Sequence, residues 1–357
     1  MYLQTDRDRT ITDTMTTKKT TIKDIANEAG VSIALVSFVM SNQGKDPDER
    51  LYKVSEETSR RILEIAKRLD YHPNNAARTL RRGKTNTIGV VLSDISNKFF
   101  ADIARCIEDR AYKYDYTVIF GSTDENAAKL ENLVKVLVDR GIDGLIIVPC
   151  AGSEKFIASV ADSHIPMVLM DRSVDNVDVS TVVLDNRAAL SLAVSTLVDS
   201  GCSRIEMIGY DMPLSNAIER EEGYRRAMVR LDLEENIAVH RIDFRNIEQQ
   251  VREVVGEAVG RGVEAFVFGT NTLTISGLKV LDSLGIKVPE QVRVVGFDDS
   301  EAFELYRTSV PYISQPIEQF GQESFDLLMK HIRNRDMQSM TVTLKPQIVE
   351  GKSSSKI

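Results

Sequence analysis

Residues 20–40, TTIKDIANEAGVSIALVSFVM, predict two short helices joined by a tight turn. Thr21, with Asp24 three residues later, is a capping signal, because the hydroxyl accepts from free helix N–H groups and the carboxylate suits the positive end of the helix dipole. Gly30 ends the first helix, and Ser32 is placed to cap the second. This pattern is typical of a helix-turn-helix, although any small helical hairpin in a globular protein can share it.

Apolar spacing separates an inner face from an outer face in both helices. The inner positions are Ile22, Ile25, Ala26, Ala29, Leu35, Val36 and Val39. The outer positions of the second helix are Ile33, Ala34, Ser37 and Phe38. A third helix is predicted over residues 55–71, SEETSRRILEIAKRLDY, and its apolar face would close a small core with the first two helices.

Charge is distributed unevenly along the 357 residues, whose formal net charge is −8. Residues 18–84 hold 14 Lys and Arg against 9 Asp and Glu, a net charge of +5, whereas residues 85–357 carry −12. The sequence therefore predicts a basic head on an acidic body. Residues 1–17 lack periodicity and are expected to form a disordered tail, with Met15 as a hypothetical start of translation, and residues 351–357 form a second tail.

The composition excludes several classes of protein. No apolar run is long enough to span a membrane, and the polar N-terminus lacks the apolar stretch of a signal peptide, so we expect a cytoplasmic protein without a membrane partner. The three separated cysteines are expected to be buried free thiols, at positions Cys106, Cys150 and Cys202. No catalytic motif, metal-ligand pattern or dinucleotide fingerprint is present, which predicts neither an enzyme nor a bound cofactor or metal.

From Thr87 onward, apolar strands alternate with amphipathic helices, which predicts a doubly wound parallel α/β architecture. The strands are expected at residues 87–94, 116–123, 144–150, 166–172, 204–210, 265–270 and 292–299. The helices are expected at residues 99–115, 127–143, 187–200, 219–231, 247–261 and 272–284. These units exceed one ordinary sheet, so we expect two subdomains.

In this order and spacing, several motifs resemble the LacI/GalR family of bacterial transcriptional regulators over residues 20–350. The motifs are TIKDIANEAGVS, YHPNNAARTLRRGKTNTIGVV, DISNKFF, VDRGIDGLII, PMVLMDR, VRVVGFDD and ISQPIEQFG. The resemblance implies a helix-turn-helix head at residues 18–72, a hinge helix at 73–85 and an effector-binding body at 86–350. It further implies an N-subdomain of residues 86–185 and 316–341 and a C-subdomain of residues 186–315 and 342–350.

The resemblance also implies which residues meet double-stranded operator DNA. Leu80 occupies the position of the family's leucine wedge, which enters the minor groove and kinks the duplex. The full set expected at the DNA is Thr21, Ser32, Ile33, Ala34, Ser37, Phe38, Asn42, Asn75, Ala77, Arg78, Leu80 and Arg81. Phe38 replaces a common base-reading arginine, so either it contacts thymine methyl groups, which we favour, or it packs in the head and specificity comes from the hinge.

A second set resembles the ligand contacts of ribose-binding periplasmic proteins of this fold. Almost all of these residues follow predicted strands, at the edge where open α/β sheets bind ligands. They are Asn97, Phe99, Phe100, Asp171, Arg172, Arg220, Phe244, Asn271, Asp298 and Gln315. Phenylalanine faces can cover a sugar ring, while arginine forks and carboxylates pair with vicinal hydroxyls. Taken one at a time, these residues could equally be helix caps or core positions.

Together these features predict a homodimeric transcriptional regulator, with repression as the expected activity, whose operator affinity depends on a small sugar such as a pentose or hexose. The effector would close the two subdomains and so stabilise or release the hinge helices. One alternative is the same regulator with a nucleobase or another non-sugar effector. The other alternative, a solute-binding protein, would need neither the basic head nor the helix-turn-helix.

Overall fold

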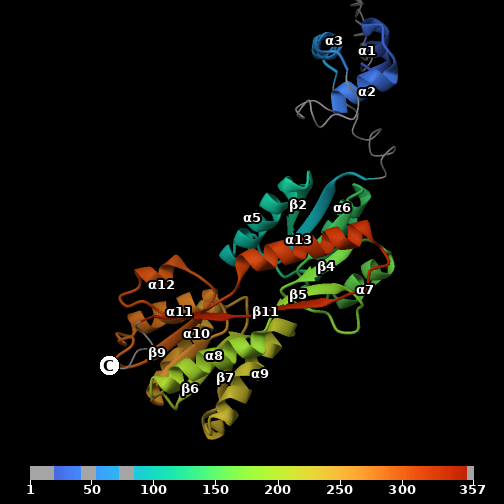
Figure 1. Cartoon of the computed structure of the whole chain (residues 1–357). Helices are drawn as coiled ribbons and strands as arrows, with labels where there is room; N and C mark the ends of the chain where they lie inside the picture. Colours follow the sequence, from blue (N-terminus) through green and yellow to red (C-terminus); the bar gives the residue numbers. More distant parts are fainter. Residues whose placement is uncertain (1–19, 42–53, 72–83, 352–357) are drawn as a thin grey trace, which may run out of the picture. The chain divides into compact units, whose positions relative to one another are not determined.

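The computed structural model describes residues 20–41, 54–71 and 84–351, and it divides into two compact units, residues 1–83 and 84–357 (Figure 1). The predicted N-terminal tail, the predicted C-terminal tail apart from Gly351 and most of the predicted hinge at residues 73–85 lie outside the described residues. Among the helices that are described, none is both long and apolar enough to cross a membrane.

The head unit contains the three expected helices, α1 (Ile22–Ala29), α2 (Ile33–Ser41) and α3 (Glu56–Arg68). Thr21 and Asp24 form a reciprocal capping box at the start of α1, and Gly30 ends this helix with a φ of 65°. The Ser32 hydroxyl accepts from the backbone N–H of Leu35 at 3.2 Å, so the predicted cap of α2 is confirmed.

Eight buried side chains from α1, α2 and α3 form the core of the head. They are Ile25, Ala26, Ala29, Val36, Val39, Ile62, Ile65 and Ala66. Ile22 and Leu35, which were expected inside, are half-buried and pack against this core. On the outer face of α2, Ile33 is 47% exposed and Ala34 is exposed, whereas Ser37 and Phe38 are half-buried.

The body contains two six-stranded sheets, which confirms the predicted pair of α/β subdomains. The N-subdomain sheet has the order β11 (Thr341–Leu344), β5 (Ser180–Leu184), β4 (Met167–Met170), β3 (Gly144–Ile147), β1 (Thr87–Leu92), β2 (Thr117–Ser122). The C-subdomain sheet has the order β12 (Gln347–Val349), β10 (Tyr312–Ser314), β9 (Arg293–Phe297), β8 (Ala265–Phe268), β6 (Ile205–Tyr210), β7 (Ala238–Ile242). All strand pairs are parallel except β10 with β12.

Helices connect and cover the two sheets (Figure 1). They are α5 (Lys98–Lys113), α6 (Ala127–Asp139), α7 (Glu154–Asp162), α8 (Asn186–Asp199), α9 (Ser215–Arg230), α10 (Ile247–Gly260), α11 (Asn271–Ser283), α12 (Glu301–Leu305) and α13 (Ile317–Arg333), with a short 3₁₀ helix, η2 (Glu234–Asn236). Although α13 follows the C-subdomain strand β10, it returns to the N-subdomain, where it packs beside α5 and against β3, β4 and β5. The chain therefore crosses between the subdomains three times.

Four sequence expectations need correction. The chain was expected to pass from the N-subdomain to the C-subdomain for the last time at residue 342, but it does so only after Leu344. The reason is that β11 pairs in parallel with β5, from Thr341↔Thr181 to Leu344↔Leu184, and so belongs to the N-subdomain. The helix expected from residue 219 begins at Ser215. Five strands (β5, β7, β10, β11 and β12) and three helices (α7, α12 and α13) were not expected. Cys106 is half-buried, whereas the free thiols of Cys150 and Cys202 are buried as predicted.

Candidate functional site

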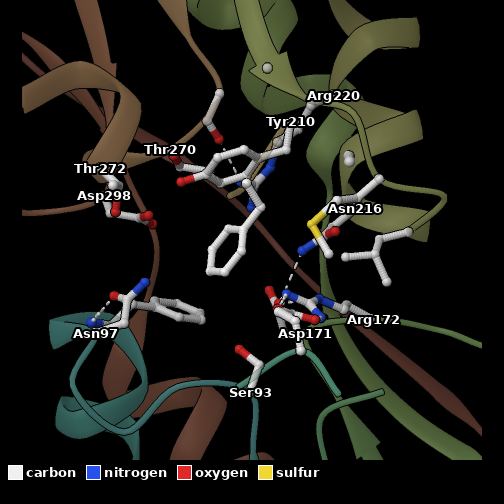
Figure 2. Close-up of a pocket in the computed structure, with 18 of the residues that line it drawn as sticks. Ser93, Asn97, Asp171, Arg172, Tyr210, Asn216, Arg220, Thr270, Thr272 and Asp298 are labelled. Carbon is white, nitrogen blue, oxygen red and sulfur yellow. Dashed lines mark hydrogen bonds and ion pairs between the residues drawn. The ribbon is translucent and has the colours of Figure 1, made fainter. Parts of the chain in front are cut away.

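A cavity of about 240 Å³ lies where the carboxyl ends of strands from both sheets meet (Figure 2). Its wall is built from residues at or after the ends of β1, β2 and β4 in the N-subdomain and of β6, β7, β8, β9 and β10 in the C-subdomain. The parallel strands explain this convergence, because their carboxyl ends share one edge of each sheet and leave backbone and side-chain polar groups there for a ligand.

Nine of the ten side chains predicted to contact an effector line this cavity. These nine are Asn97, Phe99, Phe100, Asp171, Arg172, Arg220, Phe244, Asp298 and Gln315. Asn271 does not line the cavity, because it is the first residue of α11 and its neighbours Thr270 and Thr272 face the space instead. Asn271 contributes through its backbone, whose N–H donates to the Asp298 carboxylate.

Two buried carboxylates form the polar centre of the cavity, and Figure 2 shows them on different sides of it. Asp171 and Asp298 are 3% and 7% exposed and adopt φ angles of 68° and 65°. Asn216 Nδ2 donates to Asp171 Oδ2 at 3.0 Å, and Gln315 Nε2 donates to Asp298 Oδ1 at 2.5 Å. Burial raises the pKa of both carboxyl groups, since the charged form loses its hydration.

The guanidinium of Arg172 is held mainly by Glu125, and its Nε forms a longer ion pair with Asp171 Oδ2 at 3.4 Å. Its two terminal nitrogens donate to the Glu125 carboxylate at 2.9 and 2.7 Å, and Nη1 also donates to the Pro149 carbonyl at 2.7 Å. Burial alone would lower the pKa of Arg172, but the hydrogen bonds and charge of Glu125 raise it. Glu125 thus occupies the fork that was expected to hold vicinal hydroxyls of a ligand, and the role of Arg172 toward an effector stays a prediction.

Arg220 is the cation held most deeply beside the two aspartates. It rises from α9, stacks over the Phe297 ring at 3.9 Å, and donates to Asn186 Oδ1 at 2.8 Å and to the Gly269 carbonyl at 2.7 Å. Burial lowers the pKa of Arg220, while the charges of Asp298 and Asp171 oppose that effect. These contacts fix the guanidinium in position before any ligand arrives.

Aromatic rings form the apolar part of the wall. Phe99 and Phe100 are buried and lie edge to face with centroids 4.9 Å apart. Phe244 is 42% exposed and packs edge to face against Tyr210 at 5.6 Å. Rings in both subdomains therefore border the cavity, which suits a ligand with apolar C–H faces.

Sequence reasoning missed several residues of this wall. Glu125 follows β2 within the turn TDEN, so the rule that polar residues after strands form the site would have found it. Tyr210 and Thr270 close two predicted strands and were available to the same rule. Asn216 had no signal, because the helix that carries it was expected to start only at residue 219.

The structure describes only part of the predicted DNA-binding set. In the head, Thr21 and Ser32 serve as caps, Ile33 and Ala34 are exposed, and Ser37 and Phe38 are half-buried. The other predicted DNA contacts lie outside the described residues, and they are Asn42, Asn75, Ala77, Arg78, Leu80 and Arg81. Within the described ranges, no group of three or more His, Cys, Asp or Glu side chains could hold a metal ion.

Comparison with known proteins identifies the class to which this combination of head and body belongs. Residues 85–350 match the model of the periplasmic binding proteins and sugar binding domain of the LacI family. Residues 21–74 match the model of the bacterial regulatory proteins of the lacI family. A helical DNA-binding head followed by a two-subdomain body with a ligand cavity thus defines a transcriptional regulator.

Three relatives and one solved structure illustrate the match. Catabolite control protein A of Priestia megaterium is 30% identical over 345 residues, which cover 94% of this chain and 99% of the relative. The ribose operon repressor of Halalkalibacterium halodurans is 30% identical over 331 residues, which cover 92% of this chain and 96% of the relative. The HTH-type transcriptional repressor PurR of Vibrio atlanticus is 26% identical over 338 residues, which cover 92% of this chain and 97% of the relative.

The solved structure is that of the Lac repressor dimer bound to operator and the anti-inducer ONPF. It superposes with a TM-score of 0.80 at 22% identity, covering 95% of this chain and all of that one, which shows the shared fold. The chain belongs to the LacI family of bacterial transcriptional regulators, which are DNA-binding proteins and not enzymes. As such a regulator, it acts on DNA in the cytoplasm.

Proposed function

We propose that the cavity binds a small sugar, and that this effector controls repression by setting the affinity of the head for operator DNA. The observation that carries the proposal is the placement of Asp171, Asp298 and Arg220 around one space bordered by phenylalanine rings. Carboxylates accept from hydroxyl groups, the guanidinium donates to them, and the rings cover the C–H faces of a sugar. The ribose operon repressor among the relatives supports the same ligand class.

Direct contacts between the subdomains offer a route for control. Asn216 on α9 donates to Asp171 beyond β4, and the backbone N–H of Ser173 donates to Ser215 Oγ at 2.9 Å. A ligand that bridges the same two walls would favour one arrangement of the subdomains by its difference in affinity for the two states. We propose that the operative form is a homodimer, in which this rearrangement alters operator affinity.

A purine or another nucleobase is the second candidate effector, because PurR of Vibrio atlanticus is also a relative over most of the chain. Thermal denaturation and calorimetry of the full chain with pentoses, hexoses and purines separate the two. We expect stabilisation by at least one sugar and by no purine. Stabilisation by purines alone would refute the sugar proposal and leave the cavity with a nucleobase.

The operator itself can be obtained by selecting bound duplexes from random DNA with and without the stabilising sugar. We propose that α2 contacts the bases, with exposed Ile33 and Ala34 near thymine methyl groups. Phe38→Arg should then change the selected sequence. An unchanged selection would mean that Phe38 faces the core of the head and that specificity arises elsewhere.

A further inference from the structure

Most of the positive charge around the cavity is already neutralised by protein carboxylates. The charged side chains that line the cavity are Asp94, Glu125, Asp171, Arg172, Arg220, Glu221, Arg241 and Asp298, three arginines against five carboxylates. Arg172 is held by both oxygens of Glu125. Arg241 is likewise held by both oxygens of Glu221, at 3.0 and 2.7 Å.

Arg220 differs from the other two arginines of the cavity. Among the described residues, no carboxylate forms a bidentate pair with it, and its hydrogen bonds go to the neutral acceptors Asn186 Oδ1 and the Gly269 carbonyl. Its charge is shared with Asp171 and Asp298, whose nearest donors are the neutral amides of Asn216 and Gln315. Asp171 also lies 3.4 Å from Arg172 Nε, but among the described residues neither aspartate forms a bidentate ion pair with an arginine. A ligand at Arg220 therefore meets two carboxylates whose acceptor oxygens are only partly engaged by the protein.

We infer that the cavity selects an uncharged polyhydroxy effector and rejects phosphorylated analogues, and that Glu125 enforces this choice by occupying the fork of Arg172. This inference rests on the proposed function of the cavity as an effector site. An anion would be placed next to like charges, which opposes binding in a poorly hydrated space. A neutral polyol instead donates its hydroxyls to the two aspartates and accepts from Arg220.

Burial gives further support, because it raises the pKa of both Asp171 and Asp298. Groups that already resist ionisation show that the wall has little capacity to stabilise added negative charge. The volume also limits the ligand. At about 240 Å³, the cavity is smaller than the roughly 300–1,000 Å³ of pockets for drug-sized ligands, which suits a single ring.

The test compares neutral and phosphorylated partners on the full chain. Calorimetry and thermal denaturation are measured with ribose and ribose 5-phosphate, glucose and glucose 6-phosphate, adenosine and AMP, and inorganic phosphate. Each measurement is repeated with the Arg220→Met variant, and the part of the response that this variant loses is assigned to the cavity. This subtraction removes the contribution of any phosphate bound by the basic head. In the parent protein, we expect no cavity response to inorganic phosphate, and each phosphorylated ligand to bind no better than its neutral partner.

Glu125→Gln keeps the shape of the side chain but releases the charge of Arg172. We expect it to raise the cavity affinity for inorganic phosphate roughly tenfold or more. Glu131→Gln is the matched control and should change nothing, since among the described residues Glu131 pairs only with Lys135, on the exposed face of α6. If Glu125→Gln does not fold, Glu221→Gln takes its place. This variant removes the carboxylate that pairs with Arg241, in an ion pair that is less buried, and it should also raise the affinity for phosphate.

Two results would overturn the inference. One is a cavity response of the parent protein to phosphate, or a preference for any phosphorylated ligand over its neutral partner. The other is a folded Glu125→Gln protein, or Glu221→Gln in its place, with no more phosphate affinity than Glu131→Gln. A parent that binds adenosine better than AMP and ignores sugars would refute the sugar proposal but support the selection for uncharged ligands.

Discussion

The two subdomains of the body place an aspartate at equivalent positions, yet they treat their arginines differently. Asp171 follows β4 and Asp298 follows β9, each the third strand in its sheet order. The backbone N–H of each donates to the strand before it in that order, to Val182 of β5 and to Ile313 of β10, both at 2.9 Å. Both residues have a positive φ and a buried carboxylate.

The arginines do not follow this symmetry. In the N-subdomain, Arg172 turns to Glu125 and forms a buried ion pair, with side chains that are 9% and 10% exposed. In the C-subdomain, Arg220 has only neutral hydrogen-bond acceptors and an aromatic ring. Removing one partner of a buried ion pair is costly to stability, because the other charge is left buried and unpaired. A charge held between two aspartates is instead available to a ligand.

The largest expected effect tests the stabilising half of this comparison. Arg172→Met leaves the buried carboxylate of Glu125 without its partner, so the free energy of unfolding should fall by about 3–5 kcal/mol. Chemical denaturation measures this loss. Arg187→Met, which removes a half-exposed arginine paired with Glu219 and Glu222, serves as control and should cost about 1 kcal/mol or less. An equal loss in both variants would contradict the distinction between the two kinds of ion pair.

The second expected effect tests the ligand-binding half. Arg220→Met should weaken binding of the stabilising effector by about 100-fold, a loss near 2.7 kcal/mol, because it removes the charged donor placed between two carboxylates. Its stability should change less than that of Arg172→Met, since the aspartates that lose the cation can bind a proton instead. Calorimetry with the effector measures the affinity. Arg226→Met, on the exposed face of the same helix, should bind normally.

The smallest expected effect tests the symmetry of the two aspartates through pH. The folded pKa of Asp298 is raised by burial, so its contribution to stability is fully present below the unfolded pKa, about 3.9, and is lost as pH rises through the folded pKa. The stability of the parent relative to Asp298→Asn should therefore fall with rising pH, and Asp171→Asn should show the same sign. Denaturation between about pH 4 and pH 8 measures the slope.

Glu206 provides a control of opposite sign for this pH series. Burial alone would raise its pKa, but hydrogen bonds from His240 and Arg261 lower it. Its contribution is present above the unfolded pKa and is lost as pH falls through the folded pKa. The advantage of the parent over Glu206→Gln should therefore shrink on acidification. If the stability of the parent relative to the aspartate variants also fell on acidification, the carboxylates of the cavity would not resist ionisation.

Much of the fold could be predicted from local pattern. Helix caps at Thr21 and Ser32, the glycine that ends α1, and the alternation of apolar strands with amphipathic helices all act within a few residues of the chain. The strands β5, β7, β10, β11 and β12 were not predicted, because such short segments have no distinctive period. The last crossing was misplaced because pairing of β11 with β5 joins residues about 160 positions apart.

The sequence by itself determined the class of this protein. It also predicted nine of the side chains that line its cavity, because polar residues after parallel strands must meet at one edge of a sheet. Only the tertiary structure decided which of those charges remain available. Glu125 and Arg172 lie 47 positions apart, and their pairing depends on how the turn after β2 and the end of β4 approach each other. Electrostatic pairing depends on distance and burial, neither of which is encoded in local sequence.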